Sequence, residues 1–208
     1  MNKKSPDRRI GKTKRAIYKA LLELLEDYEL SRITVTELTQ RADINRKTFY
    51  NHYTDIADVI DEMEDIWVAH LGDILNEALS PYSNFQDLNY DKIREHTVEI
   101  AIPFFKTTIS ELKDNPAYFK ILEITDGHTN LLRKIVASEK ELILNTFGSN
   151  IANNKWLDFL LIFSINGAMA MIFEWYQSDF SVAVDELANF FQILFTSDQA
   201  FDYIQKMS

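Results

Sequence analysis

A short stretch of the chain, 45–52, gathers side chains that can hydrogen-bond to phosphates and to the edges of bases. Its polar members are Asn45, Arg46, Lys47, Thr48, Tyr50, Asn51 and His52. The stretch contains no acidic residue, and its two cations are adjacent. Hydrogen-bond donors and positive charge without a nearby carboxylate suit a polyanion such as nucleic acid. The pattern therefore indicates DNA recognition rather than catalysis.

Two short helices are needed to present these side chains together. The spacing predicts helices at 35–42 and 46–53, joined by about three residues. Thr34 and Glu37 predict a capping box for the first helix, and Asn45 is a good N-cap for the second. The shared buried face is predicted to contain Leu38, Ala42, Ile44, Phe49 and Tyr53. This is the pattern of a helix-turn-helix whose second helix enters the DNA major groove.

The rest of the chain predicts long helices. Only five Gly and four Pro interrupt its 208 residues, which argues against a turn-rich β fold. A first helix is expected at 12–28, with one apolar stripe formed by Ile17, Leu21, Leu24, Leu25 and Tyr28. Later helices are expected from a cap at Thr54 or Asp55 to Leu79, at 91–113 with a kink or break at Pro103, from Asn115-Pro116, and at 129–147, 155–177 and 182–195. The expected fold is all-α, with a DNA-binding domain at 1–56 and a helical bundle domain at 57–208.

Charge is distributed unevenly along the chain. The net charge is −10, yet residues 1–55 carry 12 Lys and Arg against 8 Asp and Glu. A basic end joined to an acidic remainder fits a nucleic-acid-binding head on a different module. The chain has no cysteine, which excludes disulfides and Cys-ligated metal and fits a cytoplasmic location. The polar, basic N-terminus does not resemble a signal peptide.

Four acidic residues share one face of the predicted helix that ends at Leu79. They are Asp58, Asp61, Glu62 and Asp65. A carboxylate metal site would need histidine partners at matching spacing, which this segment lacks, so a solvated face is expected. No phosphate-binding glycine loop or nucleophile motif occurs. We therefore expect no catalytic residue, no metal and no cofactor, and the sequence does not support an α-helical enzyme.

The last two predicted helices are unusually apolar. The uncharged run 159–173 would span about 22 Å as a helix, short of a hydrocarbon core of about 30 Å, so a buried helix is expected and no membrane contact. Its small residues Gly167, Ala168 and Ala170 would allow close helix approach. The following helix carries Phe190, Phe191, Leu194 and Phe195. A helix that is apolar all round must be covered all round. A partner subunit or the remaining helices of a monomer could supply that cover.

Residues 8–60 resemble the N-terminal domain of the TetR family of bacterial transcription regulators. The resemblance rests on the basic arm, the first amphipathic helix, the segment 33–35 and the segment 42–53, with Thr-Phe-Tyr-x-His-Tyr at 48–53 as its most specific part. It covers about a quarter of the chain. Asp43 stands where the family usually has Gly, and Asp tolerates the left-handed backbone that this turn needs. Ile56 stands where the family often has a phosphate-binding Lys, so one backbone contact is missing or supplied elsewhere.

The resemblance implies a role for each polar residue. Thr36, Arg46, Lys47 and Tyr50 would face bases or nearby backbone, while Thr48, Asn51 and His52 would contact phosphates beside the helix N-terminus at Asn45. Tyr50 could instead be a partly buried core aromatic, and His52 a capping or packing residue. The basic residues of the N-terminal arm would follow phosphates or the minor groove, or form a solvated tail. They are Lys3, Lys4, Arg8, Arg9, Lys12, Lys14 and Arg15.

The resemblance also implies a homodimer that binds a palindromic double-stranded operator and is released by a small-molecule effector. Dimerisation would use the last two helices. An apolar effector pocket could be lined by Phe104, Phe105, Tyr118, Phe119, Phe159 and Phe163, each of which could equally be ordinary core. A second hypothesis keeps the DNA-binding head on an effector-free helical adaptor that recruits a protein partner. A solid core without a cavity would favour the adaptor.

Overall fold

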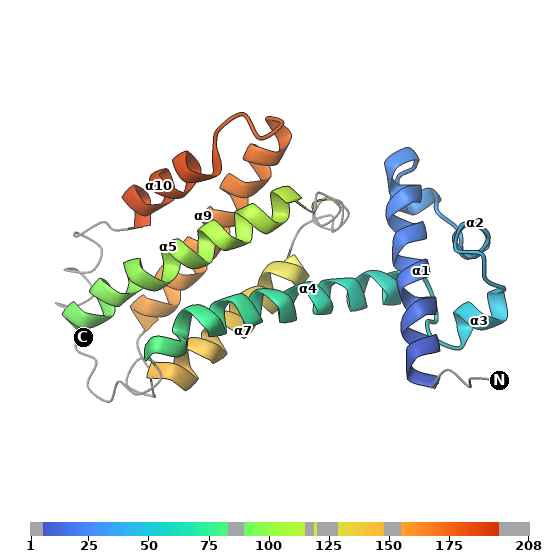
Figure 1. Ribbon diagram of the computed structural model, residues 1–208, viewed down its shortest axis with the longest axis horizontal. Coiled ribbons are helices and arrows are strands. Elements are labelled where there is room, and N and C mark those ends of the chain that lie inside the picture. The colour runs from blue at the N-terminus through green and yellow to red at the C-terminus, as the bar shows by residue number, and fades with distance from the viewer. Residues whose placement is uncertain (1–5, 83–89, 115–118, 120–128, 148–154, 196–208) are drawn as a thin grey trace. The chain divides into compact units, whose positions relative to one another are not determined.

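The computed structural model describes residues 6–82, 90–114, 119, 129–147 and 155–195. Within these ranges the chain forms α-helices, two short 3-10 helices and turns, and no β-strand occurs (Figure 1). The expected all-α fold is therefore confirmed. The described residues up to Ile66 form one compact unit and those from Trp67 onward form another. The expected functional division at residues 56 and 57 remains a prediction.

The first unit contains three helices and the beginning of a fourth. They are α1 (Pro6–Asp27), a 3-10 turn (Leu30–Arg32), α2 (Val35–Arg41), α3 (Arg46–Tyr50) and the start of α4 (Ile56–Leu79). The first helix begins six residues earlier than expected, so Arg8 and Arg9 belong to a helix rather than to an extended arm. Tyr28 was expected on the buried stripe but is 51% exposed. It lies beyond the last helical residue, where helical periodicity no longer applies.

The predicted helix caps are present. The Thr34 hydroxyl accepts a hydrogen bond from the Glu37 amide at 3.2 Å, and the Glu37 carboxylate accepts one from the Thr34 amide at 2.9 Å. Asn45 Oδ1 accepts from the Thr48 amide at 2.7 Å. For α4, Asp55 Oδ1 accepts from the Asp58 amide at 3.0 Å. These bonds satisfy amides that a helix leaves without internal partners.

The second unit consists of the rest of α4 and the helices that follow. They are a 3-10 turn (Ser80–Tyr82), α5 (Tyr90–Asp114), α7 (Thr129–Phe147), α9 (Lys155–Gln177) and α10 (Val184–Phe195). Of the kink or break expected at Pro103, the break is wrong, because α5 continues through this residue, and the kink stays a prediction. Buried Ile100 and Phe105 hold the turns on either side against the core, which compensates for the missing amide. The predicted helix start at Asn115-Pro116 lies outside the described residues.

The helices of the second unit pack around apolar side chains. Leu75 and Leu79 of α4 meet Ile100 of α5, with Phe104 and Leu142 packed against them. α10 lies along α5 (Figure 1), and the Phe105 and Phe191 rings stack with centroids 4.0 Å apart. α7 packs against α9. The second unit is therefore a helical bundle with its own core.

Because of the turn that follows α9, the last helix begins later in the sequence than predicted. α10 begins at Val184, two residues later than predicted. Asp179 and Phe180 both have left-handed backbone, each with φ of 54°. The Ala183 amide then donates to Glu186 Oε2 at 3.2 Å, which is the position of an N-cap residue. The local bonding, rather than the hydrophobic pattern, sets the start of the helix.

Candidate nucleic-acid interface

The helix α3 is held in place by a small apolar core. Phe49 and Leu38 are completely buried, and Tyr53 is nearly so. The Phe49 and Tyr53 rings lie 5.6 Å apart between centroids. Ala42 is also buried, and Ile44 is half-buried. The shared face expected from the sequence is confirmed.

The turn between α2 and α3 passes through Asp43. This residue has left-handed backbone, with φ of 52°, as expected for the position that reverses the chain. The Asp43 amide donates to Gln40 O at 3.2 Å, and the Ile44 amide donates to Thr39 O at 3.0 Å. Thr39 is buried, and its hydroxyl donates to Val35 O at 2.8 Å. The turn is thus closed by backbone bonds that leave the side chains of α3 free to point outward.

The recognition helix is shorter than predicted. α3 ends at Tyr50 rather than Tyr53, because Asn51 takes the C-cap position. The His52 amide then donates to Phe49 O at 2.8 Å, a spacing of three residues that tightens the chain into a turn. Tyr53 still reaches the core from beyond the helix, since it is only 5% exposed. The predicted end of this helix was therefore wrong by three residues.

Most of the predicted DNA-contacting side chains reach solvent. Tyr50 is 50% exposed, so it is not a core aromatic. Thr48 and His52 are half-buried. The remaining members of the set are exposed: Thr36, Asn45, Arg46, Lys47 and Asn51. The unit thus presents these residues on an accessible surface.

Arg46 and Tyr50 form a pair one turn apart on α3. The Arg46 Nη2 donates to Tyr50 Oη at 3.4 Å, and its guanidinium carbon lies 5.9 Å from the ring centroid. A guanidinium over an aromatic face keeps its planar fork available for bidentate bonding. Thr48 Oγ1 donates to Asn45 Oδ1 at 3.0 Å, so both side chains take part in the cap of α3.

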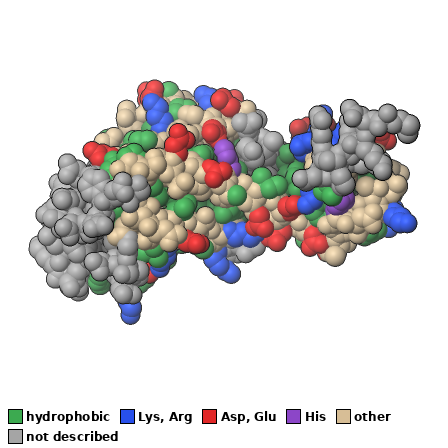
Figure 2. Space-filling view, turned by 60° about the horizontal axis from the view of Figure 1, so that its bottom comes forward, with side chains coloured by type: hydrophobic (Ala, Val, Ile, Leu, Met, Phe, Trp, Pro, Cys, Tyr) green, Lys and Arg blue, Asp and Glu red, His purple; other side chains and the backbone are tan. Residues whose placement is uncertain are grey.

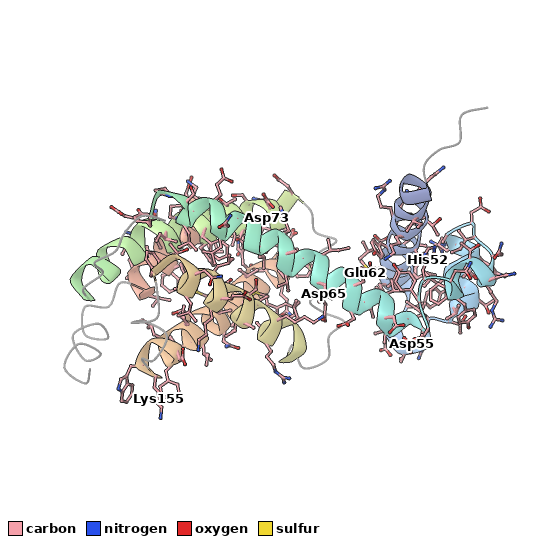
Figure 3. The ribbon with its side chains drawn as sticks, turned by 90° about the horizontal axis from the view of Figure 1, so that it is seen from below. His52, Asp55, Glu62, Asp65, Asp73 and Lys155 are labelled. Atoms are coloured by element: carbon pink, nitrogen blue, oxygen red, sulfur yellow. The ribbon has the colours of Figure 1, made fainter. Side chains whose placement is uncertain are left out.

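A cluster around Glu62 connects the elements of the first unit. Glu62 lies near the beginning of α4 (Figure 3), where it pairs with Lys14 of α1 and accepts from Tyr53 Oη at 2.5 Å. Tyr53 Oη also lies 3.2 Å from Tyr18 Oη. Burial raises the pKa of Glu62, but the bonds from Lys14 and the two tyrosines outweigh it and the pKa is lowered. Burial chiefly raises the pKa of Tyr18 to about 12.

This cluster corrects two expectations from the sequence. Lys14 was assigned to an arm that follows phosphates or the minor groove, or forms a solvated tail, but it lies within α1 and its charge is engaged by Glu62. Glu62 was assigned to a solvated acidic face, and Asp58 instead accepts from the Thr54 amide at 2.8 Å as part of a cap. Glu62 is next to Met63 in the sequence, and Met63 is buried on α4. This apolar neighbour was the available signal that Glu62 lies close to the core. Within the described residues, no three His, Asp or Glu gather as metal ligands.

The six predicted pocket residues do not share one lining. Phe105 stacks on Phe191, whereas the fully buried Phe119 stacks on Tyr176 at 4.2 Å. Phe104 is half-buried against the cluster of Leu75, Leu79 and Ile100. Phe159 and Phe163 are exposed, by 61% and 75%, and Tyr118 lies outside the described residues. An effector pocket remains a prediction.

One face of α9 is not covered by the described part of this chain, and its predicted cover by a partner subunit stays a prediction. Besides its two exposed phenylalanines, Ile162 reaches solvent on α9. On α10, the exposed apolar residues are Phe190, Ile193 and Leu194. Hydrophobic side chains are visible at the molecular surface among charged ones (Figure 2). Each helix thus exposes three apolar residues, and we call the two sets together the α9/α10 face.

By length and composition, α9 could also cross a membrane. Its segment Asp158–Gln177 has a mean hydropathy of 1.5, and 22% of the most apolar window is buried within the chain. Such a helix is weak support for a membrane span, because helices that face a core or a partner have the same composition. Ser164 and Asn166 lie in its middle and donate to backbone carbonyls one turn earlier.

The fold and the turn at Asp43 define an all-α protein with an N-terminal helix-turn-helix. No family model matches the chain. Over 79 residues, 38% of the chain, it is 35% identical to "Uncharacterized HTH-type transcriptional regulator YxbF" of Bacillus subtilis (strain 168). Over 93 residues, 42% of the chain, it is 34% identical to a ferrochelatase of Helicobacter acinonychis (strain Sheeba). The chain spans 21% and 28% of the lengths of these relatives. The stronger of the two matches is to a regulator, in agreement with the helix-turn-helix.

Proposed function

We propose that the protein is a TetR-like transcription regulator, most simply a repressor, that binds a palindromic operator as a homodimer. The observation that carries this proposal is the capped helix-turn-helix, in which exposed Arg46, Lys47 and Tyr50 stand over a buried Phe49. The similarity to a helix-turn-helix regulator supports a DNA-binding role in general.

The side chains divide between base and backbone contacts. We assign Thr36, Arg46, Lys47 and Tyr50 to bases or adjacent backbone. A bidentate bond from Arg46 to guanine would supply about 1–3 kcal/mol of discrimination. We assign Asn45, Thr48, Asn51 and His52 to phosphates. Their amides and side chains surround the first turn of α3, where the aligned peptide dipoles favour negative charge.

The α9/α10 face is the proposed dimer interface. Its exposed Phe163 and Ile193 are 75% and 72% accessible, and burying a large apolar side chain contributes about 1.5–3 kcal/mol. Two such faces related by a two-fold axis would cover each other. The two heads would then be held at a fixed half-site spacing. A small effector in the second unit would change that spacing and shift the population away from the DNA-binding form. The proposed location is the cytoplasm.

A second candidate is a DNA-binding adaptor that needs no effector. The observation that favours it is that Phe105 and Phe119 have rings from this same chain, Phe191 and Tyr176, stacked on them. Aromatic positions that are already filled do not need a ligand. In that case the α9/α10 face would recruit another protein instead of a second copy.

Fluorescence anisotropy on DNA flanking the protein's own gene tests the proposal. The measurement uses two salt concentrations and a scrambled competitor. Binding that survives the competitor and weakens with salt is the expected result. Binding no tighter than to scrambled DNA, at every flanking fragment, would contradict an operator beside the protein's own gene. We expect no enzymatic activity, and a ferrochelatase assay on the same preparation checks that expectation.

A further inference from the structure

The recognition helix α3 is too short to fix its own direction. It contains five residues, Arg46–Tyr50, which is little more than one helical turn. An isolated helix of such length is not stable in water, so contacts with its surroundings must hold it. At its beginning, the Asn45 cap and the backbone bonds of the turn at Asp43 provide such contacts. The contacts at its other end therefore decide how the helix points.

The other end of α3 is held through Tyr53. The Tyr53 amide donates to Phe49 O at 3.0 Å, so this residue is bonded directly to the last turn of the helix. The centroid of its ring lies 5.6 Å from that of Phe49 and 5.5 Å from Lys14 Nζ of α1. Asn51 and His52, which we assign to phosphates, lie between the helix and this residue. A movement of Tyr53 therefore moves the backbone that carries them.

The hydroxyl of Tyr53 makes a directional bond that apolar packing does not provide. The fully buried Phe49 fixes how deeply α3 sits, but apolar contacts have no preferred direction and allow the helix to pivot. Tyr53 Oη donates to Glu62 Oε2 and lies 3.2 Å from Tyr18 Oη. Hydrogen bonds are restricted in both distance and angle. The carboxylate of Glu62 thus fixes the phenol ring, and with it the end of α3.

The Glu62 carboxylate is itself fixed from a second side. Its other oxygen, Oε1, pairs with Lys14 of α1. Burial chiefly raises the pKa of Tyr53 above its usual value, so the hydroxyl stays protonated and donates to the carboxylate. One oxygen of Glu62 therefore accepts from Lys14 and the other accepts from Tyr53. This attachment at both oxygens leaves the carboxylate little freedom to turn.

We propose that Glu62 is a positioning residue for sequence recognition by α3, and that it acts through Tyr53. The inference rests on the proposed function, to which it adds a residue that governs specificity without contacting DNA. Binding constellations must be held to within about 0.5 Å of their productive geometry, whereas phosphate contacts carry no sequence information. Release of Tyr53 should therefore reduce discrimination between sequences more than overall affinity.

Selection from a random double-stranded DNA library, with the full chain, supplies the sequence that the wild type prefers. Fluorescence anisotropy then gives the ratio of the affinities for that sequence and for a scrambled one. Glu62→Met keeps the length of the side chain and removes both acceptors, so it should lower this ratio about tenfold, with less than about a twofold change for scrambled DNA. A loss of stability alone would not change the ratio, because a smaller folded fraction lowers both affinities equally.

A second variant removes the other partner of the same bond. Tyr53→Phe keeps the ring and its contacts and removes only the hydroxyl, so it should lower the ratio to a similar extent. Because both changes break one bond, the double variant should lose no more than the larger single effect. Glu26→Met and Tyr28→Phe are the matched controls at exposed positions of the first unit, and they should keep the wild-type ratio.

Lys14→Met distinguishes positioning from a phosphate contact. We expect a lower ratio with an unchanged salt dependence for scrambled DNA, because the Lys14 charge is engaged by Glu62. A wild-type ratio in Tyr53→Phe, or losses that add fully in the double variant, would overturn the proposal even if Glu62→Met did not fold. A wild type that selects no sequence would instead refute the proposed function, and this inference with it. The wild-type selection thus tests the regulator, and the variants test Glu62.

Discussion

Tyr53 Oη donates a hydrogen bond of 2.5 Å to Glu62, which joins the segment that follows the recognition helix to the first turns of α4. Lys14 of α1 pairs with the same carboxylate. One side chain therefore connects α1, the segment after α3 and the start of α4. The orientation of α3 relative to α1 and α4 depends on this contact as well as on the apolar core beneath it.

Replacing Glu62 by Gln should destabilise the first unit. The change removes the charge that pairs with Lys14 and weakens the acceptor for Tyr53. Because the Lys14 and Glu62 side chains are 29% and 32% exposed, solvent screens part of the effect, and a loss of about 1 kcal/mol in the free energy of unfolding is expected. Urea denaturation measures it. Glu77→Gln, an exposed change on α4, is the control, and an equal loss there would contradict the role of the cluster.

The contribution of Glu62 should depend on pH in a defined direction. Its pKa is lower in the folded protein than in the unfolded chain, so the folded state favours the ionised form. That stability is present above the unfolded pKa of about 4.3 and is lost as pH falls through the folded pKa. The difference between wild type and Glu62→Gln should therefore shrink between pH 7 and pH 3. A difference that is constant over this range would exclude the ionised carboxylate as its source.

Glu139 should produce the opposite pH dependence. Burial raises its folded pKa to about 8, so between the unfolded pKa and pH 8 the unfolded chain releases a proton that the folded protein retains. Stability is therefore fully present below the unfolded pKa and declines as pH rises towards 8. Glu139→Gln should flatten this decline by about 1–3 kcal/mol. Thermal or urea unfolding at pH 5 and pH 8 measures it, with Glu141→Gln keeping the wild-type slope.

Arg46→Ala should reduce sequence discrimination more than overall affinity for DNA. A lost bidentate contact with guanine costs about 1–3 kcal/mol against the cognate sequence only. Lys4→Ala should instead weaken binding to all sequences and lower the salt dependence. Competition anisotropy with operator and scrambled DNA separates the two. Lys19→Ala, on the exposed side of α1, is the matched control; indistinguishable profiles for Arg46 and Lys4 would refute this division of roles.

Charges placed on the α9/α10 face should dissociate the proposed dimer. Phe163→Glu or Ile193→Glu puts a carboxylate into the apolar contact, and burial of that charge without a partner is unfavourable. Sedimentation velocity should show a wild-type dimer and variant monomers, while Tyr28→Glu, a similarly exposed position in the first unit, stays dimeric. A monomeric wild type that floats with phospholipid vesicles would assign this face to a membrane instead.

The sequence by itself determined the features that depend on neighbouring residues. The capping box at Thr34, the cap at Asn45 and the left-handed turn at Asp43 follow from local bonding and backbone preference. The long helices α7 and α9 were also predicted with their observed bounds. Such features require no knowledge of distant segments, because each hydrogen bond closes within about one turn.

The tertiary structure decided which helix faces are covered and which charged side chains have partners. Lys14 lies 48 residues before Glu62 and Tyr53 lies nine before it, and only folding places the three side chains within hydrogen-bonding distance. The apolar pattern of α9 likewise did not specify which face stays exposed in the chain. Glu139 lies four residues after Ile135 and eight after Leu131, and all three are buried on α7, although the sequence alone did not single out Glu139. Burial, pairing and desolvation depend on what packs against a residue, and periodicity alone does not contain that information.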